Sequence, residues 1–484
     1  MPVTLEQYRR TQKAPALCEQ LKVRALLDNV AIQLDGSFVA GYELSGVNSY
    51  YASDEQRNRT KGQLEALIRA LPERSMQMQV RFEIAEGTGG AIDRYKHENR
   101  SESPVLQTLD RERIAAWRAK EEARYYLRHF LHAYFIWDPR VHHQQRDTDW
   151  SQKFSYSLSA KKVIGRSRQE HEDLLAEFES LLAGVEGTLY ATGLEARRMT
   201  HNDIFLEIKR ALNPLIDDTH PYREPALALF PESARSQMAN VNIEDETDDY
   251  LKIGGLLYSW VTVKDLPDAT FPGILRELSV VDFPIVANVQ VGLPDHAQAV
   301  KGFKKQLRKM TAAQRDIHGG FRLDMDAQVA QGELMQVLND LISSSLRASM
   351  VSVIVSVQTS QPVRNRREME EAERVLADRR QRVLHAIARM NGARGIFEDA
   401  AKKRLFFSGL PAMADHENFR EHDALTLHAA DLLPVEAPWR GTPNSPLTLF
   451  ETPYRQLIPF SLFDASLSDA NGLICGARAA ARHF

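Results

Sequence analysis

The stretch that decides the fold is Val30–Leu44, which reads VAIQLDGSFVAGYEL. Apolar side chains alternate along each half of this stretch, on either side of Asp35-Gly36. An Asp-Gly pair between two alternating runs is a strong β-hairpin signal, because glycine tolerates the backbone conformation that a tight turn needs. The sequence therefore predicts two antiparallel strands near the start of the chain.

A helix and a further strand are predicted after this hairpin. Ser53 and Gln56 have the spacing of a capping box, in which each side chain bonds the backbone N–H of the other residue. An apolar stripe at helical spacing follows at Leu64, Leu67, Ile68 and Leu71. Met76–Ile84 then alternates as a strand should. Hairpin, helix and strand together predict an α+β fold with mixed sheet and helix.

The same patterns predict elements along the rest of the chain. Strands are expected at His132–Trp137, Thr188–Ala191, Leu256–Val263, Phe283–Val291 and Met350–Val357. Helices are expected at Arg111–Phe130, Glu170–Ala183, Met199–Leu212, Asp295–Arg315, Asp326–Ser344 and Arg366–Met390, with another opening at Pro272-Gly273. Polar loops are expected at Gly87–Pro104 and Val141–Lys153, and short strands separated by turns from Leu405 onward.

The composition is that of an ordinary globular protein. Of 484 residues, 43% are hydrophobic and 26% charged, and the formal net charge is −4. At about 150 residues per domain the length predicts two to four domains. Two cysteines, Cys18 and Cys475, make no disulfide framework, and no apolar run reaches the roughly 20 residues of a membrane span. We therefore expect a soluble cytoplasmic protein without a global charge signal for nucleic acid.

The end of the chain resembles the start of a phosphate-binding loop. An apolar run, Leu473–Cys475, leads into Gly476, and a P-loop continues as Gly-x-x-x-x-Gly-Lys-Ser/Thr. On that spacing Ala481, Arg482 and His483 replace the second glycine, the lysine and the hydroxyl residue. An arginine fork does not substitute for a lysine point charge, and imidazole is not the oxygen ligand that Mg²⁺ prefers. These four residues are predicted to be a degenerate ATP-binding loop, without catalytic residues or metal ligands.

Two explanations of this ending stay open. The first is an alanine- and arginine-rich tail with no function. The second, which we favour, is a one-base frameshift: if Ala480–His483 is encoded GCG-GCA-AGA-CAY, reading from the last base of the Ala480 codon gives Gly-Lys-Thr. On this hypothesis the chain is a truncated form of a longer P-loop protein.

Several other motifs have a functional and a plain interpretation. His142-His143 invites a metal site but lacks ligands at zinc spacing, and Gly87–Gly90 resembles a dinucleotide turn only loosely. The acidic run Glu244–Asp249 lacks the glycine and final glutamate of a calcium loop, so a linker is favoured. Arg364–Arg367 belongs to a helix of mixed charge. Trp439-Arg440 is either a partner contact or a buried turn with a stacked arginine.

The order of motifs resembles the TraC-type ATPases of conjugative type IV secretion systems. The resemblance rests on Ala429–Pro434, Pro438–Thr442 and Ile458–Asp464, which are similar to segments that precede the motor domain in that family. The pattern from Asp35 through Glu55 and the stretch Val261–Pro272 are similar too. It covers nearly the whole chain.

The resemblance implies an architecture and a function. It implies an N-terminal α+β domain at residues 1–245, a second α+β unit at 246–405, and at 406–484 the first strand of a RecA-like α/β motor domain, truncated at its P-loop. It also implies a homo-oligomeric ATPase that uses Mg-ATP for pilus assembly and for DNA or protein transfer. Its partners would be the secretion channel and pilus-assembly proteins, at the inner membrane, which it would reach through those partners only. Because the P-loop lysine is missing, this chain is predicted not to hydrolyse ATP alone; the alternative is a non-catalytic assembly or docking subunit of the channel.

Overall fold

The structure is a computed structural model, and the residues it describes are 17–47, 52–98, 103–146, 160–216, 219–224, 233–313, 325–343, 346–415, 420–442 and 446–465. By contacts the chain divides into two compact units. The larger comprises residues up to Glu83, Phe130–Ser279 and Ile285–Ala437, and the smaller comprises Ile84–His129, Val280–Pro284 and the residues from Pro438. The boundaries expected near residues 245 and 405 stay predictions.

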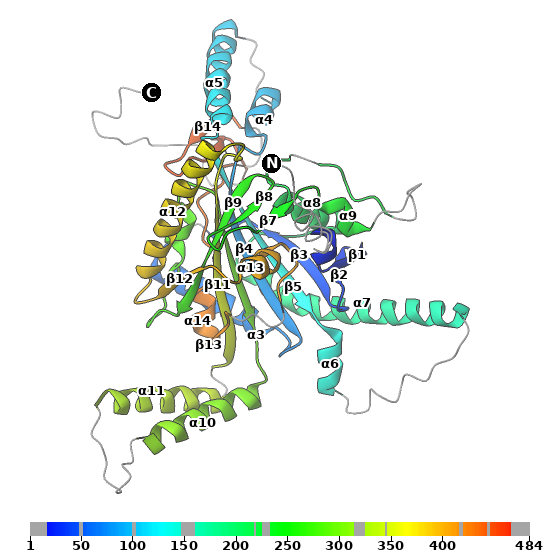
Figure 1. Cartoon of the computed structure of the whole chain (residues 1–484), viewed down its shortest axis with the longest axis vertical. Helices are drawn as coiled ribbons and strands as arrows, with labels where there is room; N and C mark the ends of the chain where they lie inside the picture. Colours follow the sequence, from blue (N-terminus) through cyan, green and yellow to red (C-terminus); the bar gives the residue numbers. More distant parts are fainter. Residues whose placement is uncertain are drawn as a thin grey trace. The chain divides into compact units, whose positions relative to one another are not determined.

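A large sheet organises the larger unit (Figure 1). Thirteen strands of the described residues join it, in the order β1-β2-β3-β5-β4-β10-β11-β9-β8-β7, with β6 on β3, β12 on β9 and β13 on β11. Their bounds are β1 Val23–Leu27, β2 Val30–Gln33, β3 Phe38–Leu44, β4 Met76–Glu86, β5 Leu127–Trp137, β6 Ala196–Arg198, β7 Ile243–Glu244, β8 Leu251–Ile253, β9 Leu256–Asp265, β10 Ile285–Gly292, β11 Ala348–Gln358, β12 Arg394–Glu398 and β13 His422–Leu425. The α+β fold class is confirmed.

The predicted hairpin is present as β2 and β3, which pair antiparallel with Ile32 opposite Phe38. Gly36 has a φ of +90°, which explains the glycine in the turn. A second hairpin joins β1 to β2 through Asp28 and Asn29, both with positive φ. Two such residues make the turn that suits the twist of antiparallel strands.

Helices flank the sheet and link its strands (Figure 1). In the larger unit they are α2 Leu17–Gln20, α3 Asp54–Arg69, α6 Pro139–Arg146, α7 Ala160–Ala191, α8 His201–Leu212, α9 Ala234–Met238, the 3₁₀ helix η3 Arg276–Val280, α10 His296–Ala313, α11 Met325–Ile342, α12 Arg366–Ala388, α13 Lys402–Gly409 and α14 Thr426–Asp431. Across the described ranges, none of the helices combines the length and the apolar character needed to cross a membrane.

A core cluster of the described residues lies between the sheet and the helices α8, α9 and α13. Phe205 of α8, Phe406 of α13 and Trp260 of β9 are all buried in it. Their burial removes large apolar areas from water, at about 25 cal/mol per Å². The sheet face that they cover therefore forms an extensive core in the larger unit.

The smaller unit has a core of its own. It contains α4 Ala91–Glu98, α5 Pro104–Glu122 and the hairpin of β14 Thr448–Glu451 with β15 Leu457–Phe460. Tyr95 and Trp117 meet edge to face inside it, with ring centroids 5.2 Å apart. The structure thus adds α4 to a stretch, Gly87–Pro104, that was predicted to be loop.

Two predicted elements in the first half are wrong in type or extent. Thr188–Ala191 is the end of α7 rather than a strand, because Leu182, Val185 and Leu189 continue a buried stripe at helical spacing. The helix predicted to reach Phe130 stops at Glu122, since Arg124 takes a positive φ of 54° and β5 begins soon afterwards.

Three further predictions need correction. The loop predicted from Val141 contains the end of α6. Pro272-Gly273 begins a turn that leads into the short 3₁₀ helix η3, because Gly273 has a φ of +84° that a helix cannot continue through. Beyond Leu405 the chain includes the helices α13 and α14 as well as short strands.

Candidate functional site

The loop residues predicted from the sequence, Gly476, Ala481, Arg482 and His483, lie outside the described residues. The structure therefore says nothing about their geometry. The RecA-like motor start predicted around them stays a prediction as well.

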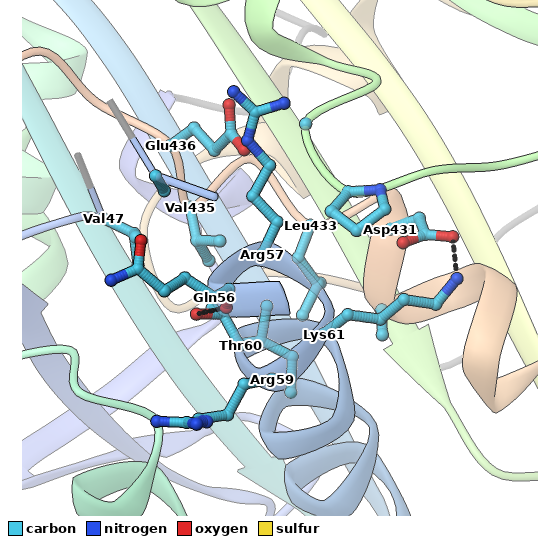
Figure 2. A pocket seen from close by; sticks show the side chains of 15 residues that line it. Val47, Gln56, Arg57, Arg59, Thr60, Lys61, Asp431, Leu433, Val435 and Glu436 are labelled. Atoms are coloured by element: carbon cyan, nitrogen blue, oxygen red, sulfur yellow. Dashed lines mark hydrogen bonds and ion pairs between the residues drawn. The ribbon is translucent and has the colours of Figure 1, made fainter. Parts of the chain in front are cut away.

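A pocket of about 410 Å³ lies within the larger unit (Figure 2). This volume falls in the range of small-ligand sites, which runs from about 300 to 1,000 Å³. Helix α3 forms one wall, and the end of α14 with the segment after it forms the other. The lining residues are Val47, Ala52, Gln56, Arg57, Arg59, Thr60, Lys61, Leu64, Pro272, Gly273, Ala430, Asp431, Leu433, Val435 and Glu436.

The first turns of α3 bring three cations to the pocket: Arg57, Arg59 and Lys61. The helix starts where the sequence predicted, because the Ser53 hydroxyl accepts the Gln56 N–H while the Gln56 side chain accepts the Ser53 N–H. This capping box fixes the register of the helix and so the direction of the cations. The prediction of the capping box is confirmed.

The opposite wall is fixed by backbone pairing rather than by a regular element. Val47 and Glu436 form an isolated parallel bridge, in which the Val47 N–H donates to the Val435 carbonyl at 2.8 Å and the Ala437 N–H donates to the Val47 carbonyl at 3.2 Å. These bonds hold the segment after α14 beside the chain that leads into α3. Both walls of the pocket are therefore tied to each other at its rim.

An ion pair joins the two walls inside the pocket (Figure 2). Lys61 Nζ lies 2.5 Å from Asp431 Oδ2, and the Asp431 side chain is fully buried. The second carboxylate oxygen, Oδ1, has no hydrogen-bond partner among the described residues. A buried carboxylate oxygen normally has a donor, so this atom is available to a water molecule or a bound group.

Glu436 lies against Gly273 on the same side of the pocket. A Cβ at Gly273 would be 2.5 Å from Glu436 Oε1, so a side chain at this position would displace the carboxylate. Glu436 Oε2 is buried and lacks a hydrogen-bond partner within the described ranges. The pocket thus presents cationic heads on one wall and two acceptor oxygens on the other. It suits a ligand or peptide segment that carries both an anionic group and hydrogen-bond donors.

A second charged cluster lies between α8 and the strands β4 and β5. Arg210 donates to Glu83 Oε1 at 2.5 Å and to Glu207 Oε2 at 2.6 Å, and Arg81 pairs with Glu83 as well. His132 Nδ1 lies 3.7 Å from Glu207 Oε2. Paired charges of this kind are costly to break, so the cluster holds α8 on β4 and β5.

The electrostatics of this cluster follow from its pairing. Burial acts to raise the pKa of Glu83, but the guanidinium groups of Arg210 and Arg81 outweigh it and hold that pKa well below its usual value. Burial, together with the charges of Arg210 and Arg81, lowers the pKa of His132. The cluster therefore contains ionised carboxylates and a neutral imidazole at neutral pH.

The remaining candidates of the sequence show no ligand-binding geometry. His142 and His143 lie on α6, with Nε2 atoms 3.5 and 3.3 Å from the two carboxylate oxygens of Glu177. Among the described residues no group of three or more His, Cys, Asp or Glu side chains is placed to hold a metal ion. Trp439 is 41% exposed and touches Phe460 edge to face, so it is not a buried turn.

The sequence did not reveal the pocket. Asp431 lies in the motif Ala429–Pro434, which indicates the family resemblance but gives Asp431 no role in a site. Lys61 lies 370 residues away from it. Lys61 lies on the polar face of a helix, and Asp431 follows an apolar run. Neither pattern predicts an ion pair between them, because only the fold brings the two residues together.

Comparison with known proteins finds a similar protein of conjugal transfer. No protein-family model matches it. The conjugal transfer protein TrbE of Rhizobium radiobacter is 24% identical over 470 residues, which cover 93% of this chain. This similarity over nearly the whole chain supports a TraC/TrbE-type family. The resemblance inferred from the sequence motifs is thereby confirmed.

The chain spans about half of the length of this curated relative, since the match covers 52% of TrbE. The match includes nearly all elements of both units, because it extends over most of the chain. The activity and partners of a whole TraC/TrbE-type protein therefore come to this chain only as proposals.

Proposed function

We propose that this chain is the N-terminal portion of a conjugative-transfer ATPase of the type IV secretion type, which takes part in pilus assembly and in DNA or protein transfer. The alignment with TrbE, which runs over 93% of the chain, carries the proposal. The motifs Ala429–Pro434 and Pro438–Thr442, shared in order with this family, support it independently. Its partners would be secretion-channel and pilus-assembly proteins at the inner membrane, and it would assemble as a homo-oligomer.

The residues at the end of the chain do not fit Mg-ATP. A P-loop uses its lysine at the β- and γ-phosphates and its Ser or Thr at Mg²⁺. This sequence has Arg482 and His483 at those positions, and Ala481 in place of the second glycine. We therefore propose that the chain neither binds Mg-ATP tightly nor hydrolyses it alone, and we derive no step through the nucleotide.

A non-catalytic docking subunit of the channel is the second candidate. The described residues form the large sheet and the core that packs on it. A chain that folds in this way can bind channel partners without a motor. On this alternative the role of the chain is structural.

Two measurements on the purified chain and its host test the proposal. Affinity purification after cross-linking in donor cells should recover secretion-channel proteins; recovery of none of them, with the chain well expressed, would overturn the assignment. Calorimetric titration with Mg-ATP should give no binding in the micromolar range. Micromolar binding would overturn the proposed loss of the nucleotide site while leaving the secretion role intact.

A further inference from the structure

Helix α10 carries an unusual charge pattern. Five of its residues are cations, Lys301, Lys304, Lys305, Arg308 and Lys309, and the helix has no acidic residue. All five side chains are exposed. Their spacings of three, four, seven and eight residues place them on one face, over about 12 Å of helix at 1.5 Å per residue.

The other face of α10 is already occupied. Ala299, Val300 and Phe303 pack with Val337 and Leu341 of α11, next to the start of β11. Figure 1 shows α10 and α11 side by side as a helical pair, and their shared cluster also includes Ala348 of β11 and Leu425 of β13. The cations are therefore exposed on the residues of α10 that do not take part in this small apolar core.

The charges on this face are not balanced locally. Within the described part of the chain, none of the five cations has a carboxylate within ion-pair distance. By contrast Arg366 and Arg374, on the exposed face of α12, lie 3.4 and 3.5 Å from the carboxylates of Glu370 and Glu371. The face is positive although the whole chain has a net charge of −4. Such a local excess of positive charge attracts an anionic partner to this face.

The composition of the helical pair favours a lipid surface over a nucleic acid. Four of the five cations are lysines, which interact as point charges with any phosphate. Phe303, the aromatic residue of α10, is committed to the core and offers no platform for stacked bases. Met335 and Ile342, seven residues apart on α11, are 50% and 53% exposed. Exposed apolar side chains on the helix that packs against a cationic helix suit the interfacial region of a bilayer.

We propose that the cationic face of α10 binds the surface of a membrane that contains anionic phospholipids. Clusters of four to eight Lys and Arg residues on an amphipathic helix bind such surfaces, and each cation adds to the affinity. This contact is direct, in addition to the contact through partners that the resemblance implies. It depends only on described residues, so it stands or fails separately from the proposed secretion role.

The test is co-sedimentation of the full chain with lipid vesicles. One set contains equal parts of phosphatidylglycerol and phosphatidylcholine, and the other contains phosphatidylcholine alone, both at about 0.1 M salt, where charges still act over about 10 Å. The α10 triple variant is K304Q, K305Q and R308Q. The α12 triple variant is R366Q, R367Q and R374Q, which removes the same number of positive charges as the α10 triple variant. Thermal melts that match the unmodified chain check that both variants are folded.

The unmodified chain should bind the anionic vesicles and not the neutral ones. The α10 triple variant should bind about 100-fold more weakly, and the α12 triple variant should bind within about threefold of the unmodified chain. Equal losses in both variants would overturn the proposal, because they would report net charge alone. So would the absence of binding to anionic vesicles. Tighter binding to DNA oligonucleotides at the same salt, lost in the α10 triple variant, would assign the face to nucleic acid instead.

Discussion

Replacement of Lys61 by methionine should destabilise the larger unit, because it breaks the ion pair inside the pocket. The Lys61 ammonium lies 2.5 Å from Asp431, and the side chains are 15% and 0% exposed. Methionine keeps the length of the side chain and its apolar contacts but removes the charge. The Asp431 carboxylate would then be buried with neither oxygen paired.

The expected loss in the free energy of unfolding follows from this burial. Removing one partner of a buried ion pair costs about 3–5 kcal/mol, because the other charge is left uncompensated. Asp431 borders a pocket that water can enter, so we expect a value near the lower end, about 3 kcal/mol. Replacing both residues, as K61M with D431L, removes both charges and should recover most of the loss.

Urea unfolding followed by tryptophan fluorescence measures this change, with the slope of the transition as a check that the same surface is exposed. Lys252→Met is the matched control. Its partner Glu244 is 3.0 Å away but 46% exposed. An exposed pair of this kind contributes less than about 1 kcal/mol.

Equal losses for Lys61→Met and Lys252→Met would refute the reasoning, since the pocket pair would then behave as a surface pair. The double variant provides a second check. If K61M with D431L is as unstable as K61M alone, the loss comes from the packing of the Lys61 side chain and not from a stranded charge.

Three further outcomes follow from single residues, each measured by thermal or urea unfolding. Ser53→Ala should cost about 1 kcal/mol through loss of the capping box, and no change would mean that the cap is not formed in solution. The pKa of Glu83 is held below its ordinary value of 4.5 by Arg210 and Arg81, so its stabilisation is present above pH 4.5 and is lost as the pH falls further. Glu83→Gln should lower stability at neutral pH by about 3 kcal/mol and flatten the dependence below pH 4.5; an unchanged profile would contradict the pairing. Burial lowers the pKa of His129 from 6.5 to about 4, so stability should fall between pH 6.5 and 4 and His129→Gln should flatten that interval, whereas a profile as steep as before would assign the loss to other groups.

The sequence predicted the elements whose signals are local. The hairpin around Asp35-Gly36 and the capping box at Ser53 depend on residues a few positions apart, and both are present. The strand predicted at Met350–Val357 is β11. Its long run of β-branched residues, which is buried in the sheet, favours a strand.

Predictions failed where distant packing overrode a local preference. Thr188–Ala191 has β-branched and aromatic residues typical of a strand. It is helical because Leu182, Val185 and Leu189 form one buried stripe that the short window could not show. The turn at Arg124 gave no signal either, since arginine rarely takes a positive φ.

The order of the strands in the sheet could not be predicted from the sequence for a similar reason. Strand β4 lies next to β10 across some 200 residues of chain, and nothing local to either strand specifies that neighbour. The pocket depends on the same kind of pairing, since Val47 meets Val435 and Lys61 meets Asp431 only once the sheet has formed. Fold class and family could therefore be inferred from the sequence, whereas the site in the described residues could not.

Mating frequency is the measurement that tests the central claim most directly. Donor cells that carry the transfer element would be compared with donors in which the codons of this chain are deleted in frame, and with deleted donors that express the chain's gene from a second plasmid. The account predicts that deletion abolishes detectable transfer and that the supplied gene restores it. Transfer at the parental frequency after deletion, with the secretion channel still expressed, would contradict the assignment to conjugative transfer.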